Sequence, residues 1–171
     1  MAKANRGGKR ASGGTSRIIA TGGGVRPLNE ELAEKRMIAA EHFKRIGAEV
    51  DQNGMVTLYH ATSPQNAESI RENGFKPTSA PVNGAFVDDL KDRVFFGHDK
   101  QWVENNWSSD GYEIMKVKIP AEYLHQAGRN TSEVFVEGRI KKTGSVWVPD
   151  TKPTSTAWDR ILVKRWKKRN S

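Results

Sequence analysis

Three short segments of the sequence carry side chains whose types suit the cleavage of a glycosidic bond. His60 stands in the first segment, Phe95 and Phe96 in the second, and Glu133 in the third, with Glu137 four residues later. A carboxylate stabilises the positive charge that develops on a sugar ring as its leaving group departs. An aromatic face orients a planar ring, and an imidazole hydrogen-bonds a hydroxyl group. None of these roles requires a metal, and we expect no metal site.

The elements that must position these residues begin with a strand and a helix. Residues 55–61 are rich in β-formers and predict a short strand that carries His60. Ser63 is a suitable N-cap and Pro64 a suitable first residue for the helix that follows, and Gly74 is a suitable end for it. The next residues, up to position 92, hold prolines and glycines and are expected to form a long loop.

Strands dominate the second half of the expected fold. Asp99 can cap one short helix, and residues 120–124 are expected to form a turn or a single helical turn. Further strands are expected at residues 93–96, 112–119, 132–136, 145–148 and 160–166. The fold class is therefore predicted to be α+β, with a mainly antiparallel β-sheet and a few short helices.

Charge divides the chain into three parts. The first 26 residues hold six basic and no acidic residues, and residues 159–171 hold six basic residues and one acidic residue. Because the net charge is +8, residues 27–158 carry −3. We expect residues 1–27 to be a disordered basic tail, residues 28–50 to hold a helix at about 30–46 capped by Asn29, and residues 51–171 to form the catalytic domain. Basic ends can contact polyanions such as nucleic acids.

In order and spacing, the three segments resemble the poly(ADP-ribose) polymerase-like branch, or His-Tyr-Glu branch, of the ADP-ribosyltransferase superfamily. This family has a Leu-[Tyr/Trp]-His-Gly-[Thr/Ser] strand, a helix, a Gly-[Ile/Val]-Tyr-Phe-Ala strand and a late strand that begins with Asn/Ser-Glu. The resemblance covers about residues 55–166 and implies an ADP-ribosyltransferase-like fold with a split β-sheet core. The matching segments are LYHAT at 58–62 with NGFKP at 73–77, DRVFFG at 92–97 and SEVFVEG at 132–138.

The resemblance implies a role for each matching residue. His60 would hydrogen-bond the adenosine-side ribose of NAD and act with Glu133, the catalytic glutamate. The backbone of Ala61 would hold the nicotinamide carboxamide, beside the hydroxyl of Thr62. Phe95 would stack on the nicotinamide. Ala61 replaces the usual glycine and Phe95 the usual tyrosine, so the resemblance leaves the geometry of the NAD site open.

The residues also permit other interpretations. His60 could make a core contact, and one of Phe95 and Phe96 belongs to the core, with the register deciding which one faces the cleft. Glu137 is the alternative catalytic carboxylate or a surface partner of Arg139. Three more histidines have no metal-ligand spacing and are expected at the surface: His42, His98 and His125.

The sequence contains no cysteine, which excludes disulfides and thiolate metal sites. No apolar run approaches the roughly 20 residues of a membrane helix, so we expect a cytoplasmic protein with no membrane partner. We also expect it to be a monomer, and delivery to a host cell is an alternative location. The expected activity is NAD-dependent mono-ADP-ribosylation of a protein or nucleic-acid acceptor with release of nicotinamide, as in bacterial or phage toxins and effectors. The alternatives are a tRNA 2′-phosphotransferase-like enzyme and a non-enzymatic, basic nucleic-acid-binding or virion-associated module.

Overall fold

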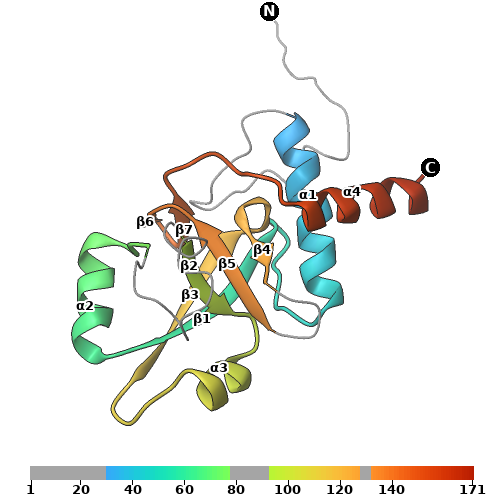
Figure 1. The fold of residues 1–171 in the computed structure, drawn as a ribbon. Coiled ribbons are helices and arrows are strands. Elements are labelled where there is room, and N and C mark those ends of the chain that lie inside the picture. Colours follow the sequence, from blue (N-terminus) through green and yellow to red (C-terminus); the bar gives the residue numbers. More distant parts are fainter. Residues whose placement is uncertain (1–29, 78–92, 128–131) are drawn as a thin grey trace, which may run out of the picture.

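A computed structural model describes residues 30–77, 93–127 and 132–171 of the chain (Figure 1). The expected basic tail, the Asn29 cap and most of the expected long loop lie outside these residues. Four α-helices and one 3-10 helix are described: α1 (Glu30–Arg45), α2 (Pro64–Asn73), α3 (Lys100–Asn106), η3 (Ala121–Tyr123) and α4 (Ala157–Arg169).

The strands form two antiparallel sheets in an α+β arrangement. This confirms the predicted α+β class and the mainly antiparallel sheet. The main sheet has the order β3-β1-β2-β5-β4, and β6 and β7 form a separate hairpin. The strands are β1 (Met55–Thr62), β2 (Arg93–Gly97), β3 (Glu113–Pro120), β4 (His125–Gln126), β5 (Glu133–Glu137), β6 (Ile140–Thr143) and β7 (Val146–Pro149). The sequence analysis did not predict β4 and β6.

One face of the main sheet forms most of the hydrophobic core. Alternate residues of its strands, such as Leu58, Val117 and Val134, are almost completely buried there. Phe75 and Trp147 pack on this face from outside the sheet, with their ring centroids 5.2 Å apart. Reciprocal backbone hydrogen bonds between Phe75 and Ile140, of 2.8 and 3.1 Å, join the segment after α2 to the β6–β7 hairpin. We call this side the core face of the main sheet.

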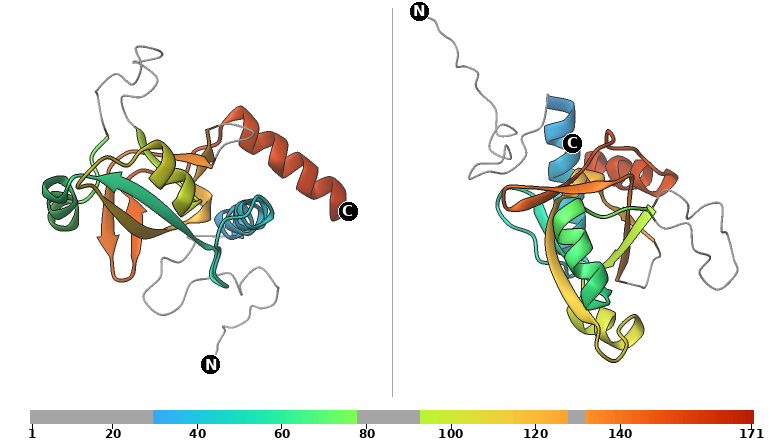
Figure 2. Two further views of the ribbon diagram at one scale, coloured as in Figure 1. Left: turned by 90° about the horizontal axis from the view of Figure 1, so that it is seen from below. Right: turned by 90° about the vertical axis from the view of Figure 1, so that its left-hand side faces the viewer.

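The helices lie at opposite ends of the sheet. Figure 1 places α2 and α3 toward one end, whereas α1 and α4 lie together at the other, and the views in Figure 2 agree. Helix α2 begins and ends as its sequence predicts, since the Ser63 hydroxyl accepts from the Asn66 backbone N–H and Gly74 has a φ of 83°. A side chain at Gly74 would also collide with the backbone carbonyl of Ile140, so only glycine fits there.

The prediction of a last strand at residues 160–166 is wrong, because these residues lie in α4. The helix begins with a complete capping box, in which Thr156 and Asp159 each accept a hydrogen bond from the other's backbone N–H. Within the described residues, this segment pairs with no strand. The capping box instead satisfies backbone N–H groups that have no partner at the start of a helix. Trp158, Leu162 and Trp166 of α4 are half-buried on the side that faces α1, whereas Ile161 is exposed.

Candidate functional site

The three predicted segments lie on adjacent strands. His60 is in β1, Phe95 and Phe96 are in β2, and Glu133 begins β5, while the sheet places these strands in the order β1-β2-β5. Tyr59 pairs with Gly97, and Gly97 pairs in turn with Glu133, so one row of the sheet runs through the three strands. Adjacent strands are about 4.8 Å apart, which puts the backbones of β1 and β5 roughly 10 Å apart. We call this region the strand-end site.

His60 is largely enclosed by aromatic rings on the core face. Its ring centroid lies 5.1 Å from that of Phe75 and 5.6 Å from that of Phe96. Burial lowers the pKa of His60, and a hydrogen bond to the Phe95 carbonyl partly opposes this shift. That bond joins Nδ1 to the carbonyl oxygen over 3.0 Å. Because a carbonyl only accepts, the proton is on Nδ1, and in the neutral ring Nε2 is an acceptor.

The two phenylalanines of β2 have different surroundings. Phe96 is 0% exposed and packs 5.1 Å from Phe75, so it belongs to the core. Phe95 points to the opposite face, where it is half-buried and lies 5.9 Å from the Phe135 ring. The register thus decides that Phe95 is the ring with accessible surface.

Ala61 and Thr62 follow the same alternation along β1. Ala61 is half-buried and lies on the Phe95 side of the sheet, because successive residues of a strand point to opposite faces. Thr62 shares the core face with His60 and is 7% exposed. The residues therefore form two groups, with Ala61, Phe95 and Glu133 on one face and His60 and Thr62 on the other.

Glu133 is half-buried at the first position of β5, and burial raises the pKa of its carboxyl group. Helix α3 packs close to it, since a side chain at Gly97 would collide with Val103 of this helix. Two polar atoms beside it, Ser132 Oγ and His98 Nδ1, are buried without a hydrogen-bond partner in the described structure. Such atoms are uncommon in native proteins and often mark a place where water, an ion or a ligand binds.

Glu137, the alternative catalytic carboxylate, belongs to a different set of contacts. Its carboxylate accepts a hydrogen bond from the Thr154 hydroxyl and lies 3.7 Å from His125 Nε2. His125 also contacts Asp159 through Nδ1, at 2.8 Å, and Thr154 through Nε2, at 3.1 Å. Arg139 is exposed. These contacts join β4 and β5 to the start of α4. Glu137 therefore has a structural partner in Thr154.

The prediction that His42 and His125 are surface residues is wrong. His42 is 8% exposed and hydrogen-bonds Gln126 at 2.8 Å, and His125 is 2% exposed. Both lie where α1 and α4 meet the edge of the main sheet, which the sequence alone does not reveal. His98 is half-buried.

Arg36 and Glu122, absent from the sequence-based candidates, form a buried ion pair nearby. They make two hydrogen bonds of 2.7 Å, and their side chains are 0% and 3% exposed. With His125 and Asp159, this pair makes up what we call the polar lock. The spacing of Thr156 and Asp159 was the one signal in the sequence that could have located part of it.

Within residues 30–77, 93–127 and 132–171, no group of three or more histidine and acidic side chains is placed to hold a metal ion. No helix in this part of the chain has the length and apolar character needed to span a bilayer. A comparison of the chain with protein-family models, with curated proteins and with solved structures finds no match.

Proposed function

We propose that the protein is an NAD-dependent mono-ADP-ribosyltransferase that transfers ADP-ribose to a protein or nucleic-acid acceptor and releases nicotinamide. The observation that carries the proposal is the adjacency of β1, β2 and β5, the three strands that hold the motif residues. The arrangement into a five-stranded sheet and a separate hairpin is compatible with a split-sheet ADP-ribosyltransferase fold.

The residues that the resemblance assigns to NAD lie on both faces of the main sheet. Ala61, Phe95 and Glu133, which the resemblance assigns to the nicotinamide end, share one face. His60, assigned to the adenosine-side ribose, lies on the other face. The main sheet therefore lies between the two groups of residues.

The protonation of His60 suits a ribose contact. Because Nδ1 donates to Phe95 and the pKa of the ring is lowered, Nε2 carries a lone pair that can accept from a hydroxyl group. The described residues provide no hydrogen-bond partner for Nε2. The bond to the Phe95 carbonyl also fixes the ring relative to β2, which carries the stacking ring.

The surroundings of Glu133 suit its role at the reacting bond. In a partly desolvated position, its carboxylate interacts more strongly with positive charge that develops on the ribose as nicotinamide leaves. Its raised pKa also brings the group closer to the range in which it can accept a proton from the acceptor nucleophile.

The test is the release of nicotinamide from NAD, measured with the purified protein and candidate acceptors. Replacing Glu133→Gln removes the charge while keeping the shape, and we expect the rate to fall roughly 100- to 1,000-fold. Glu137→Gln is the matched control, because it makes the same change four residues away in the same strand, and it should keep most of the activity. Release of nicotinamide that is unaffected by Glu133→Gln, or no release by wild type, would overturn the proposal.

A further inference from the structure

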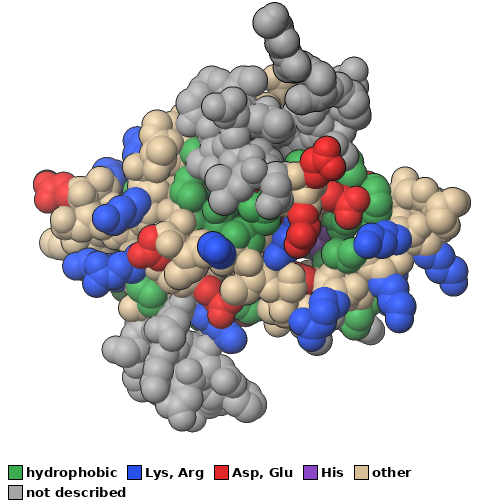
Figure 3. All heavy atoms as spheres, turned by 90° about the horizontal axis from the view of Figure 1, so that it is seen from above, with side chains coloured by type: hydrophobic (Ala, Val, Ile, Leu, Met, Phe, Trp, Pro, Cys, Tyr) green, Lys and Arg blue, Asp and Glu red, His purple; other side chains and the backbone are tan. Residues whose placement is uncertain are grey.

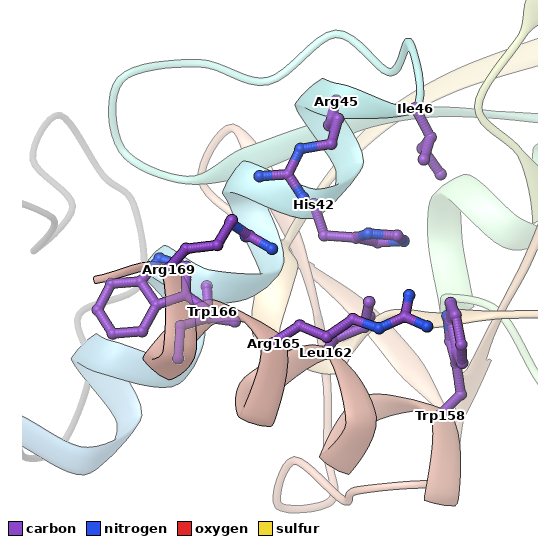
Figure 4. Close-up of a pocket in the computed structure, with 9 residues that line it drawn as sticks. His42, Arg45, Ile46, Trp158, Leu162, Arg165, Trp166 and Arg169 are labelled. Carbon is purple, nitrogen blue, oxygen red and sulfur yellow. The ribbon is translucent and has the colours of Figure 1, made fainter. Parts of the chain in front are cut away.

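A groove between α1 and α4 lies apart from the strand-end site. It encloses a cavity of about 180 Å³, and Figure 4 shows side chains from both helices that line it. Three arginines take part, Arg45 from α1 and Arg165 and Arg169 from α4, together with Trp158 and Trp166. We call it the basic–aromatic groove.

The charge of α4 is strongly positive and mostly uncompensated within the helix. Its 13 residues include six Lys and Arg residues and one acid, Asp159. Asp159 is held by His125 and by the helix cap. Glu41 of α1 contacts two of the groove arginines, Arg45 at 2.8 Å and Arg169 at 3.4 Å. In Figure 3, Lys and Arg side chains lie along the side where the C-terminal helix projects, and others lie at the opposite end of the same face.

The two tryptophans are held by their ring nitrogens. Trp166 donates its Nε1–H to Glu41 over 2.9 Å, and Trp158 donates to Gln126 over 3.3 Å. The guanidinium of Arg165 lies 5.4 Å from the centroid of the Trp158 ring, a cation–π contact. These contacts orient the indoles before any ligand binds, which reduces the entropy cost of stacking on them.

The position of α4 is also fixed. The polar lock holds its first turn through Asp159, and Lys35 of α1 donates to the Thr154 carbonyl over 2.9 Å, just before the helix. The groove is thus built between two anchored helices.

We infer that the basic–aromatic groove binds single-stranded nucleic acid, with bases stacked on the indoles and phosphates contacted by the arginines. Aromatic platforms within a positive groove are the usual means of binding single strands without reading their sequence. Because the groove shares no residue with the strand-end site, this inference stands whether or not the protein turns over NAD.

Other polyanions fit the groove less well. A bilayer surface would need an apolar helix face, but Ile161 is the single exposed large hydrophobic residue of α4. An acidic peptide would pair with the arginines and leave the indole faces unused. Duplex DNA or RNA keeps its bases stacked inside the helix, where the indoles cannot reach them.

The test is binding of the full chain to labelled oligo(dT) and oligo(U) of about 12 nucleotides, a length typical of small single-strand sites. Trp166→Leu removes a stacking surface, and we expect it to weaken binding roughly 5- to 150-fold, as loss of one stacked base does. Trp166→Phe, which keeps an aromatic face, should restore most of the affinity. Thermal unfolding of each variant verifies that it is folded.

The salt dependence of binding tests the arginines. The double variant R165Q/R169Q should lower the slope of log affinity against log salt concentration by about 1.4, or about 0.7 for each lost phosphate contact. Lys141→Gln with Lys142→Gln removes the same charge from the exposed β6 strand and should leave the slope unchanged.

Three results would overturn the inference. The first is equal affinity of wild type and Trp166→Leu for the oligonucleotides. The second is equal loss of salt dependence in the arginine and lysine double variants, which would indicate diffuse charge attraction. The third is tighter binding of duplex, poly-glutamate or anionic vesicles than of the single strand.

Discussion

His60 and His125 are two enclosed histidines of the same sheet, but they have different surroundings. At the strand-end site, His60 is packed among Phe75 and Phe96, and its one hydrogen bond within the described structure goes to the Phe95 carbonyl. In the polar lock, both ring nitrogens of His125 have side-chain partners.

The carboxyl groups of the two regions also differ, because their pKa values are shifted in opposite directions. At Glu133, burial raises the pKa. At Asp159, burial also acts to raise the pKa, but hydrogen bonds from His125 and from the Thr156 backbone, with the charge of His125, outweigh it, so the pKa is lowered. The surroundings therefore favour the charged form of Asp159 and disfavour that of Glu133.

The difference indicates separate roles. A carboxylate that the protein itself stabilises contributes to folding, as in the polar lock. A partly desolvated carboxyl group, such as that of Glu133, contributes less to stability than one whose charge the protein stabilises. The polar lock thus holds the helices in place, whereas burial at Glu133 acts against the charged form of its carboxyl group.

The largest expected effect is on the buried ion pair of the polar lock. Arg36→Leu leaves the Glu122 charge buried without its partner and should lower the free energy of unfolding by about 3–5 kcal/mol. Arg45→Leu breaks an exposed pair in the same helix and should cost less than about 1 kcal/mol. Urea denaturation measures both, and equal losses would contradict the distinction between them.

The next effect compares the two carboxyl groups directly. Asp159→Asn should lower the free energy of unfolding by about 1.5–3 kcal/mol, the range for a hydrogen bond to a charged group, without abolishing nicotinamide release. Glu133→Gln should lower the rate of release roughly 100- to 1,000-fold but leave stability within about 0.5 kcal/mol of wild type, or above it. If both changes reduced stability equally, Glu133 would also be a structural residue.

The contribution of Asp159 should depend on pH. Since its pKa is lowered in the folded state, the stabilisation is complete above its ordinary value of 3.8 and is lost as the pH falls through the folded value. The difference in unfolding free energy between wild type and Asp159→Asn should therefore be constant at neutral pH and shrink in acid. A difference that is independent of pH would exclude a charged Asp159 as its source.

The smallest effect concerns His60. His60→Phe keeps an aromatic ring but removes Nε2, so KM for NAD should rise about 3- to 10-fold, the value of one hydrogen bond. Because the pKa of His60 is lowered in the folded state, wild type should also become less stable as the pH falls below 6.5. The variant has no ionisable group at this position, so this loss of stability should be absent from it. Steady-state kinetics and thermal unfolding measure the two effects, and an unchanged KM would remove His60 from the NAD site.

Local sequence signals predicted most elements because they act over a few residues. The Ser63-Pro64 start of α2, the Asp99 cap of α3 and the β-rich residues of β1 all have the expected structure. Residues 160–166 are helical and not the expected strand, because the capping box of Thr156 and Asp159 begins a helix just before them. The sequence leaves both Glu133 and Glu137 as candidates, since both point to the same face of one strand.

The sequence by itself determined the α+β class, the bounds of α2, the start of α3 and, to within one residue, the bounds of β1, because caps and alternation depend on neighbours along the chain. The tertiary structure decided that Phe96 is buried while Phe95 is accessible, and that Glu137 has Thr154 as a partner. It also decided that α1 and α4 together form a groove. Register, burial and contacts between distant segments depend on how the chain folds back on itself, which no local pattern records.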